Sequence, residues 1–134
     1  MKKLKKVTSG NYEELVVLST KPVIINLCAD WCHACTLVEQ SLAVVNEQYE
    51  DYALILNLDV MSQPELKDML EIDSLPLTIM MDGGVVTKKM PGVPTPEEFI
   101  KEMELETIKE YKEKGIYYHP KRNYIPEYIR NETW

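Results

Sequence analysis

The chain has 134 residues, 45% of them hydrophobic, and a formal net charge of −7. This length suits a single domain with a sizeable hydrophobic core and is too short for two such domains. The acidic balance argues against nucleic acid as a partner, and no apolar run approaches the length of a membrane span, so we expect neither nucleic-acid nor membrane binding.

The first six residues carry four lysines, as the basic start of a secretion signal does. Thr8, Ser9 and Asn11 follow where a signal needs an apolar stretch, so we expect a cytoplasmic protein. Thiols stay reduced in the cytoplasm, where a pair of cysteines is more typical of a cycling redox centre than of a structural disulfide. The lysines themselves fit a solvated end that guards an edge strand against unwanted pairing.

Two elements are expected before residue 30. Asn11 followed by Glu14 has the spacing of a capping box and predicts a helix that ends near Leu18. The apolar run over residues 22–28 then predicts a buried strand, in which Asn26 is the polar exception.

The next segment alternates helix and strand once more. A helix is expected to begin near Cys32, because apolar residues recur at helical spacing at Val38, Leu42, Val45 and Tyr49. Residues 53–59 predict a second apolar strand, and Ser62 with Glu65 predicts the capped start of a short helix. Strands that alternate with helices predict a parallel sheet covered by helices.

The pattern changes after Pro76. Two runs of strand-forming residues, 77–81 and 85–90, flank the sequence Asp82-Gly83-Gly84. The glycine pair supplies the positive φ angles of a tight turn, so these strands are expected to form an antiparallel hairpin.

A last helix is expected to run from Thr95 to Gly115. Thr95, Pro96 and Glu98 combine a cap, a proline at the first helical position and a glutamate at the third. The apolar stripe of this helix consists of Phe99, Ile100, Met103, Ile108 and Tyr111.

Cys32 and Cys35 form a Cys-x-x-Cys pair between the first strand and the helix that follows it. Cysteines three apart in a first helical turn share one face and can close a disulfide. The spacing also supplies half of a zinc site, but the chain beyond this segment offers only His119 as a further Cys or His ligand. The helix N-terminus favours a thiolate, which predicts Cys32 as nucleophile and the deeper Cys35 as resolving cysteine.

Cys28 precedes the pair and completes the spacing C-x3-C-x2-C, which radical enzymes use to hold an iron–sulfur cluster. Those enzymes have much longer chains, and a strand would leave Cys28 behind the start of the helix. We therefore interpret Cys28 as a small buried core residue. A brown, iron-containing purified protein would contradict this interpretation.

Four features occur in a fixed order: Trp31-Cys32-His33-Ala34-Cys35 after a buried strand, Leu75-Pro76 before the hairpin, Asp82-Gly83-Gly84 as its turn, and Gly92 before the last helix. With them, roughly residues 1–114 resemble the thioredoxin family, and we expect residues 1–115 to form one thioredoxin-like domain. The resemblance implies an α/β fold whose central mixed sheet joins parallel strands to a C-terminal antiparallel hairpin, flanked by helices. It also implies a thiol–disulfide oxidoreductase with a disulfide-bearing protein as substrate, a reductase or small thiol as electron donor, and no cofactor or metal.

The resemblance also implies where the substrate binds. In this family the proline before the hairpin follows a cis peptide bond and lies against the dithiol. Leu75-Pro76 is therefore expected to be cis and to offer backbone groups to an extended substrate. Trp31 is expected to shape the rim of the site, and His33 to lie beside the nucleophile.

Asn26 stands where the family usually has a buried aspartate that helps to move the proton of the resolving cysteine. An amide cannot accept a proton at neutral pH, so we expect resolution of mixed disulfides to be slower by about 10-fold or more. Ile55, on the neighbouring strand, supplies no charge either. The alternative is that Asn26 is only a hydrogen-bonded polar group of the core.

His33 and Ala34 separate the two cysteines, where thioredoxins usually have Gly and Pro. A protonated histidine stabilises the adjacent thiolate and makes the pair more oxidising, so we expect a potential of about −260 to −180 mV. The alternative is that His33 faces solvent and has little effect on the potential.

Residues 116–134 form an aromatic-rich C-terminal extension, with Tyr117, Tyr118, Tyr124, Tyr128 and Trp134. This segment is too aromatic for an ordinary solvated terminus. It either folds back over its own domain, with a short helix after Pro126, or docks a partner.

We predict an oxidoreductase that cycles Cys32 and Cys35 between dithiol and disulfide and reduces protein disulfides. The main alternative is a non-catalytic interaction module that binds a partner through the C-terminal extension. Asn26 and Ile55 favour it, because neither supplies a charge. A third possibility is a metal or iron–sulfur cluster bound between two chains through Cys32.

Overall fold

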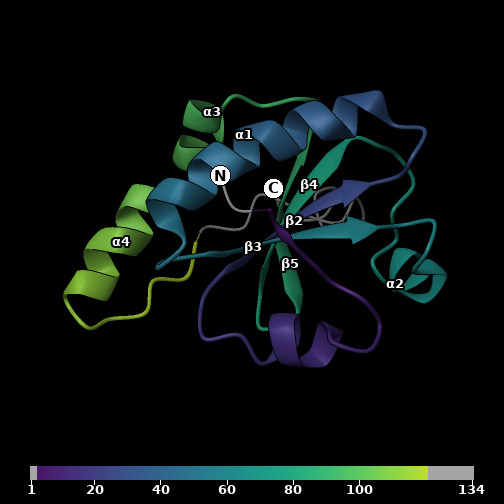
Figure 1. The fold of residues 1–134 in the computed structure, drawn as a ribbon. Helices are drawn as coiled ribbons and strands as arrows, with labels where there is room; N and C mark the ends of the chain where they lie inside the picture. Colours follow the sequence, from purple (N-terminus) through teal and green to yellow (C-terminus); the bar gives the residue numbers. More distant parts are fainter. Residues whose placement is uncertain (1–2, 121–134) are drawn as a thin grey trace, which may run out of the picture.

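A mixed five-stranded sheet with the strand order β1-β3-β2-β4-β5 forms the centre of the molecule (Figure 1). The structure is a computed structural model and describes residues 3–120. The strands are β1 (Lys5–Lys6), β2 (Val23–Cys28), β3 (Leu54–Asp59), β4 (Leu77–Asp82) and β5 (Val85–Pro91). The helices are a short π-helix η1 (Glu13–Val17) and α1 (His33–Tyr49), α2 (Pro64–Met69), α3 (Pro96–Glu102) and α4 (Leu105–Glu113).

Strand directions confirm the expected mixed sheet. The first three strands of the chain, β1, β2 and β3, pair in parallel, whereas β4 runs antiparallel to both β2 and β5. Gly83 and Gly84 form the hairpin turn with φ angles of 60° and 86°, which side-chain-bearing residues rarely adopt. Lys5 and Lys6 lie exposed on the edge strand, where charge discourages pairing with another chain.

The sheet buries both of its faces. On one face, α1, α3 and α4 pack over alternate strand residues such as Ile24 and Met80. On the other face, η1 and α2 pack over Ile25 and Leu27. β2 therefore lies in the middle of the sheet with helices on both sides, which explains its nearly continuous apolar sequence. In residues 3–120 no helix is long and apolar enough to cross a membrane.

Neither of the first two expected helix caps forms. Asn11 accepts a hydrogen bond from Thr8 N at 2.7 Å and donates to Lys6 O, so its side chain serves the preceding turn and η1 begins after Tyr12. Asparagine side chains bond to nearby backbone groups in turns as well as at helix caps, and here the turn takes the side chain. Ser62 donates to Asp59 O, and Gln63 stands at the start of α2 without a side-chain cap.

The last helix is divided, contrary to the single helix expected. Its start is as expected, because Thr95 and Glu98 form a complete capping box. Glu104 adopts a left-handed conformation with φ 56° and separates α3 from α4. Met103 and Leu105 are both fully buried, and residues two apart point to opposite sides of a continuous helix. The chain therefore turns between them so that both side chains reach the core.

The beginning of the C-terminal extension lies against the domain. Tyr118 donates a hydrogen bond to Glu104 at 2.7 Å, and Tyr117 donates to Asp82 at 3.1 Å. His119 Nδ1 lies 2.6 Å from the other oxygen of Asp82. Residues 121–134, including Tyr124, Tyr128, Trp134 and the helix expected after Pro126, lie outside the described residues.

Candidate active site

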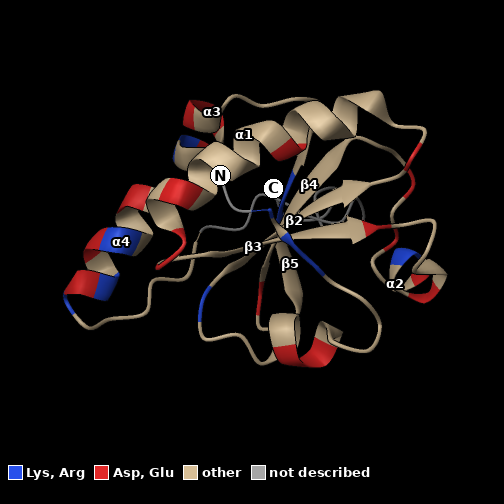
Figure 2. Cartoon of the chain, in the orientation of Figure 1, with Lys and Arg blue, Asp and Glu red and all other residues tan. Residues whose placement is uncertain are grey.

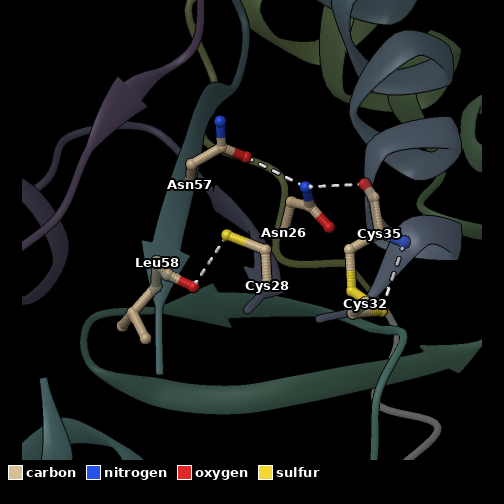
Figure 3. Close-up of a disulfide and its surroundings, with 6 residues drawn as sticks. All are labelled: Asn26, Cys28, Cys32, Cys35, Asn57 and Leu58. Carbon is tan, nitrogen blue, oxygen red and sulfur yellow. Dashed lines mark hydrogen bonds between the residues drawn. A yellow bond between two sulfur atoms is a disulfide. The ribbon is translucent and has the colours of Figure 1, made fainter. Parts of the chain in front are cut away.

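A disulfide between Cys32 and Cys35 stands at the N-terminus of α1, with its Cα atoms 5.4 Å apart (Figure 3). Cys32 is the N-cap residue in an extended conformation, and its sulfur accepts a hydrogen bond from Cys35 N at 3.3 Å. The sulfur thus takes the place of the side-chain oxygen that usually caps a helix. The expected position of Cys32 at the start of this helix is confirmed.

The local field at Cys32 favours a negative charge once the disulfide is reduced. α1 has 17 residues, and its aligned peptide dipoles place roughly half a positive charge at its N-terminus. Cys32 keeps 7% of its surface exposed and Cys35 keeps 2%, so an incoming disulfide reaches Cys32 more readily. The assignment of Cys32 as nucleophile and Cys35 as resolving cysteine is consistent with this geometry and stays a prediction.

The predicted substrate contacts differ in their surroundings. Trp31 is 68% exposed and His33 is also exposed, whereas Ala34 is half-buried between the cysteines. The Leu75–Pro76 peptide bond is cis, and Pro76 O accepts a hydrogen bond from Gly92 N at 3.4 Å. Leu75 packs against the same apolar cluster that contains both cysteines. Their roles in binding stay predictions.

A row of neutral polar residues crosses the sheet beneath the disulfide. Asn26 is fully buried and pairs in register with Asn57 on β3 and Thr78 on β4. Its Nδ2 donates to Asn57 Oδ1 at 3.0 Å and to Cys35 O at 3.5 Å (Figure 3). Asn26 Oδ1 and Thr78 Oγ1 have no hydrogen-bond partner among the described residues. Among the described residues, the Asn26 side chain therefore donates two hydrogen bonds and accepts none.

The strand register shows which residue of β3 lies opposite Asn26. Ile55 pairs with Ile24, so it lies one pleat away, and Asn57 is the residue directly opposite Asn26. Asn57 and Thr78 were missed from the sequence. The available signal was that Asn57, like Asn26, interrupts an otherwise apolar strand.

Cys28 is half-buried, so it is less enclosed than expected. Its thiol donates to Leu58 O at 3.3 Å and points away from the disulfide (Figure 3). Burial, followed by the nearby charges of Asp59 and Glu39, raises the pKa of Cys28 to about 11. Within residues 3–120 no group of three or more His, Cys, Asp or Glu side chains is arranged to hold a metal ion.

The raised pKa of Cys28 predicts that its thiol reacts slowly with alkylating agents. After reduction with a dithiol, we expect iodoacetamide at pH 8 to modify Cys32 at least about 100-fold faster than Cys28, because only the thiolate reacts and Cys28 is mostly protonated at that pH. Peptide mass spectrometry over a time course measures both rates. Equal rates for the two cysteines would contradict the prediction.

This arrangement, a redox-capable cysteine pair at a helix start above a mixed α/β sheet, defines the class of thioredoxin-fold proteins. The family model named Thioredoxin matches residues 3–105, and the chain belongs to the thioredoxin family. It is 29% identical over 100 residues to thioredoxin Y1, chloroplastic, of Arabidopsis thaliana, and the match covers 75% of this chain and 58% of that protein. It is 28% identical over 85 residues to a thioredoxin of Chlorobaculum thiosulfatiphilum, a match that covers 63% of this chain and 79% of that one.

The solved structure of chloroplastic thioredoxin z shares the fold. Its TM-score with this chain is 0.69 at 22% sequence identity, and the match covers 82% of this chain and 97% of that chain. The chain spans about three fifths of the length of the Arabidopsis relatives thioredoxin Y1 and thioredoxin Y2. The matched family region ends at residue 105, where α4 begins.

Proposed function

We propose that the protein is a thiol–disulfide oxidoreductase that reduces disulfides in other proteins. The observation that carries this proposal is the Cys32–Cys35 disulfide at the N-terminus of α1. Membership of the thioredoxin family supports it. The pair itself carries the two electrons, so no cofactor is needed for the reaction.

The reaction proceeds in two exchange steps. The Cys32 thiolate attacks one sulfur of the substrate disulfide, forms a mixed disulfide and releases the first substrate thiolate. The Cys35 thiol then loses its proton and attacks the Cys32 sulfur, which closes the Cys32–Cys35 disulfide and releases the second substrate thiolate. The substrate gains two electrons, and a reductase or a small thiol returns the pair to the dithiol.

The surface around the disulfide is proposed to bind the substrate. Exposed Trp31 offers an apolar contact beside Cys32, and His33 faces solvent next to it. The half-buried Leu75 and Pro76 offer backbone groups to an extended peptide, which would bind as an added strand. We assign substrate binding to these four residues, with Ala34 and Asn26 modulating the pair.

The cytoplasm is the compartment that we propose for this activity, because a reducing thiol pool keeps such a pair ready to donate electrons. Thioredoxin Y1 of Arabidopsis thaliana is named as chloroplastic, which is a statement about that protein. Microscopy of the tagged protein in its own cells decides the compartment.

Equilibration with glutathione tests the proposed activity. We expect the pair to titrate as a two-electron couple at about −260 to −180 mV, above the potential of about −270 mV typical of thioredoxin. His33→Gly is the matched variant, and it is expected to shift the potential downward if His33 stabilises the thiolate. An unchanged potential in His33→Gly would show that His33 has no effect on the potential of the pair. A pair that never exchanges with glutathione would contradict the proposed function.

The second candidate function is a non-catalytic interaction module. The neutral row beneath the disulfide favours it, because Asn26 and Asn57 supply no proton acceptor. The aromatic C-terminal extension would then be the contact surface for a partner. Removing this extension tests whether it stabilises its own domain or instead serves as such a contact surface.

Truncation after Gly115 is expected to lower the free energy of unfolding by about 1–3 kcal/mol, because it removes the hydrogen bonds of Tyr117 and Tyr118 and the packing of Tyr118 on Tyr111. Reduction of small disulfides is expected to persist. Urea unfolding and a small-disulfide assay measure the two properties. Unchanged stability would mean that the C-terminal extension does not stabilise its own domain and would favour partner docking.

A further inference from the structure

A cavity of about 390 Å³ adjoins the disulfide. It lies between the first turns of α1, the ends of β2 and β3, and the N-terminal segment. Cys32 and Cys35 both line it, as do Asn57, Glu39 and Asp59. The cavity therefore connects the resolving cysteine to carboxylates on α1 and at the end of β3.

The resolving step requires a group that accepts the proton of Cys35. Asn26 and Asn57 are amides, and Thr78 is an alcohol, so no residue of the neutral row is a proton acceptor near neutral pH. Cys35 is 2% exposed, which leaves its thiol little direct contact with bulk solvent. The lining of the cavity is the nearest source of a base for this proton.

Glu39 is placed for this role by the geometry of α1. It follows Cys35 by four residues, so the two side chains share one face of the helix with Cβ atoms about 5–6 Å apart. Helical side chains also lean toward the N-terminus, which brings the Glu39 carboxylate toward the cysteine pair. Glu39 is half-buried and its charge acts on Cys28, which lines the same cavity.

The other charged groups of the cavity are less suited to the role. Asp59 comes from the end of β3, and one of its oxygens accepts a hydrogen bond from Met61 N at 3.0 Å. Asp30 lies exposed in the loop before α1, and Lys3 and Lys6 come from the N-terminal segment. Figure 2 shows acidic residues in the loops at this end of the sheet. Of the carboxylates that line the cavity, Glu39 is the one on the same helix as Cys35.

We propose that Glu39 accepts, through solvent in the cavity, the proton of Cys35 during resolution of the mixed disulfide. The inference rests on the proposed function. In this step the S–H bond of Cys35 breaks, its proton passes to the Glu39 carboxylate, and the sulfur attacks Cys32 Sγ. The Cys32–Cys35 bond forms as the bond from Cys32 to the substrate breaks, and the substrate departs as a thiolate. Glu39 thus accepts a proton through solvent and does not touch the substrate.

Glu39→Gln tests the proposal with a chromogenic aryl disulfide that releases one coloured thiolate at each step. Stopped-flow mixing with the reduced protein resolves the attack by Cys32 from the resolution by Cys35. At pH 7 we expect the second phase to slow by about 10-fold or more while the first phase stays within about twofold. As the pH rises, the second phase of Glu39→Gln is expected to approach that of the unchanged protein, because hydroxide then deprotonates Cys35.

Asp59→Asn is the matched control, because it removes the same charge from another carboxylate that lines the cavity, at the end of β3. It is expected to change the second phase by less than about threefold. Asn26→Asp combined with Glu39→Gln is expected to restore a fast second phase, since it supplies another carboxylate beneath Cys35. An unchanged second phase in Glu39→Gln, or equal slowing by Asp59→Asn, would overturn the proposal. If the protein without substitutions shows no first phase, the attack by Cys32, the proposed function itself is refuted.

Discussion

Replacing Cys32 by serine is expected to reduce the dithiothreitol-driven reduction of a protein disulfide to the rate of the reductant alone. The first exchange step needs a thiolate at the N-terminus of α1, and a serine hydroxyl does not ionise at neutral pH. A loss of about 1000-fold or more in the catalysed rate therefore follows, the largest effect expected of any single change in the chain. Turbidity or a fluorescent substrate measures the rate.

Cys35→Ser is the informative partner of that variant. It keeps the nucleophile but removes the resolving thiol, so we expect it to react once and to remain as a mixed disulfide with the substrate. Intact-protein mass spectrometry detects the adduct on Cys32. Equal reduction rates for Cys32→Ser and the unchanged protein would favour the interaction module over the enzyme.

Asn26→Asp is expected to accelerate the resolution step by about 10-fold near neutral pH. The side chain lies beneath Cys35, with its amide nitrogen 3.5 Å from Cys35 O, and a carboxylate there can accept a proton. Stopped-flow release of the second thiolate measures the effect. A rate equal to that of the unchanged protein would mean that another acceptor already removes the proton without limiting the step.

The same substitution has a cost in stability that depends on pH. Position 26 is fully buried, so desolvation raises the pKa of a carboxyl placed there above its value in the unfolded chain. The native state then holds the proton more tightly, and its stability falls as pH rises from about 4 through the raised pKa, by about 1.4 kcal/mol for each unit of pKa difference. Urea unfolding of Asn26→Asp at pH 5 and pH 8 checks the sign. Greater stability at pH 8 would contradict it.

Much of the fold follows from local pattern. The apolar runs at 22–28 and 53–59, the glycine turn after Asp82 and the Thr95 cap each indicate an element that the structure contains. The division between α3 and α4 does not follow, because it depends on Met103 and Leu105 both being buried against the rest of the domain. The side chain of Asn11 could either cap the following helix or bond to the preceding turn, and the structure shows the bond to Thr8.

The residues of the candidate site, too, could be predicted from the sequence only in part. The spacing of Cys32 and Cys35 and the strand before them are sufficient to place the disulfide at a helix start. Asn57 and Thr78 could not be assigned to the site, because strand register is fixed by pairing across the sheet and a shift of one residue would turn both to the other face. Glu39 became a candidate only once the cavity was known.

The two ends of α1 are about 25 Å apart, given 1.5 Å of rise per residue over its length. The disulfide occupies one end, and α4 lies near the other end (Figure 1). There Tyr49 donates a hydrogen bond to Glu106 of α4. A fluorophore or an electrode linker attached to α4 will therefore stand well clear of the sulfur atoms. Surface-tethered voltammetry through such an anchor therefore leaves the disulfide end of α1 accessible to molecules in solution.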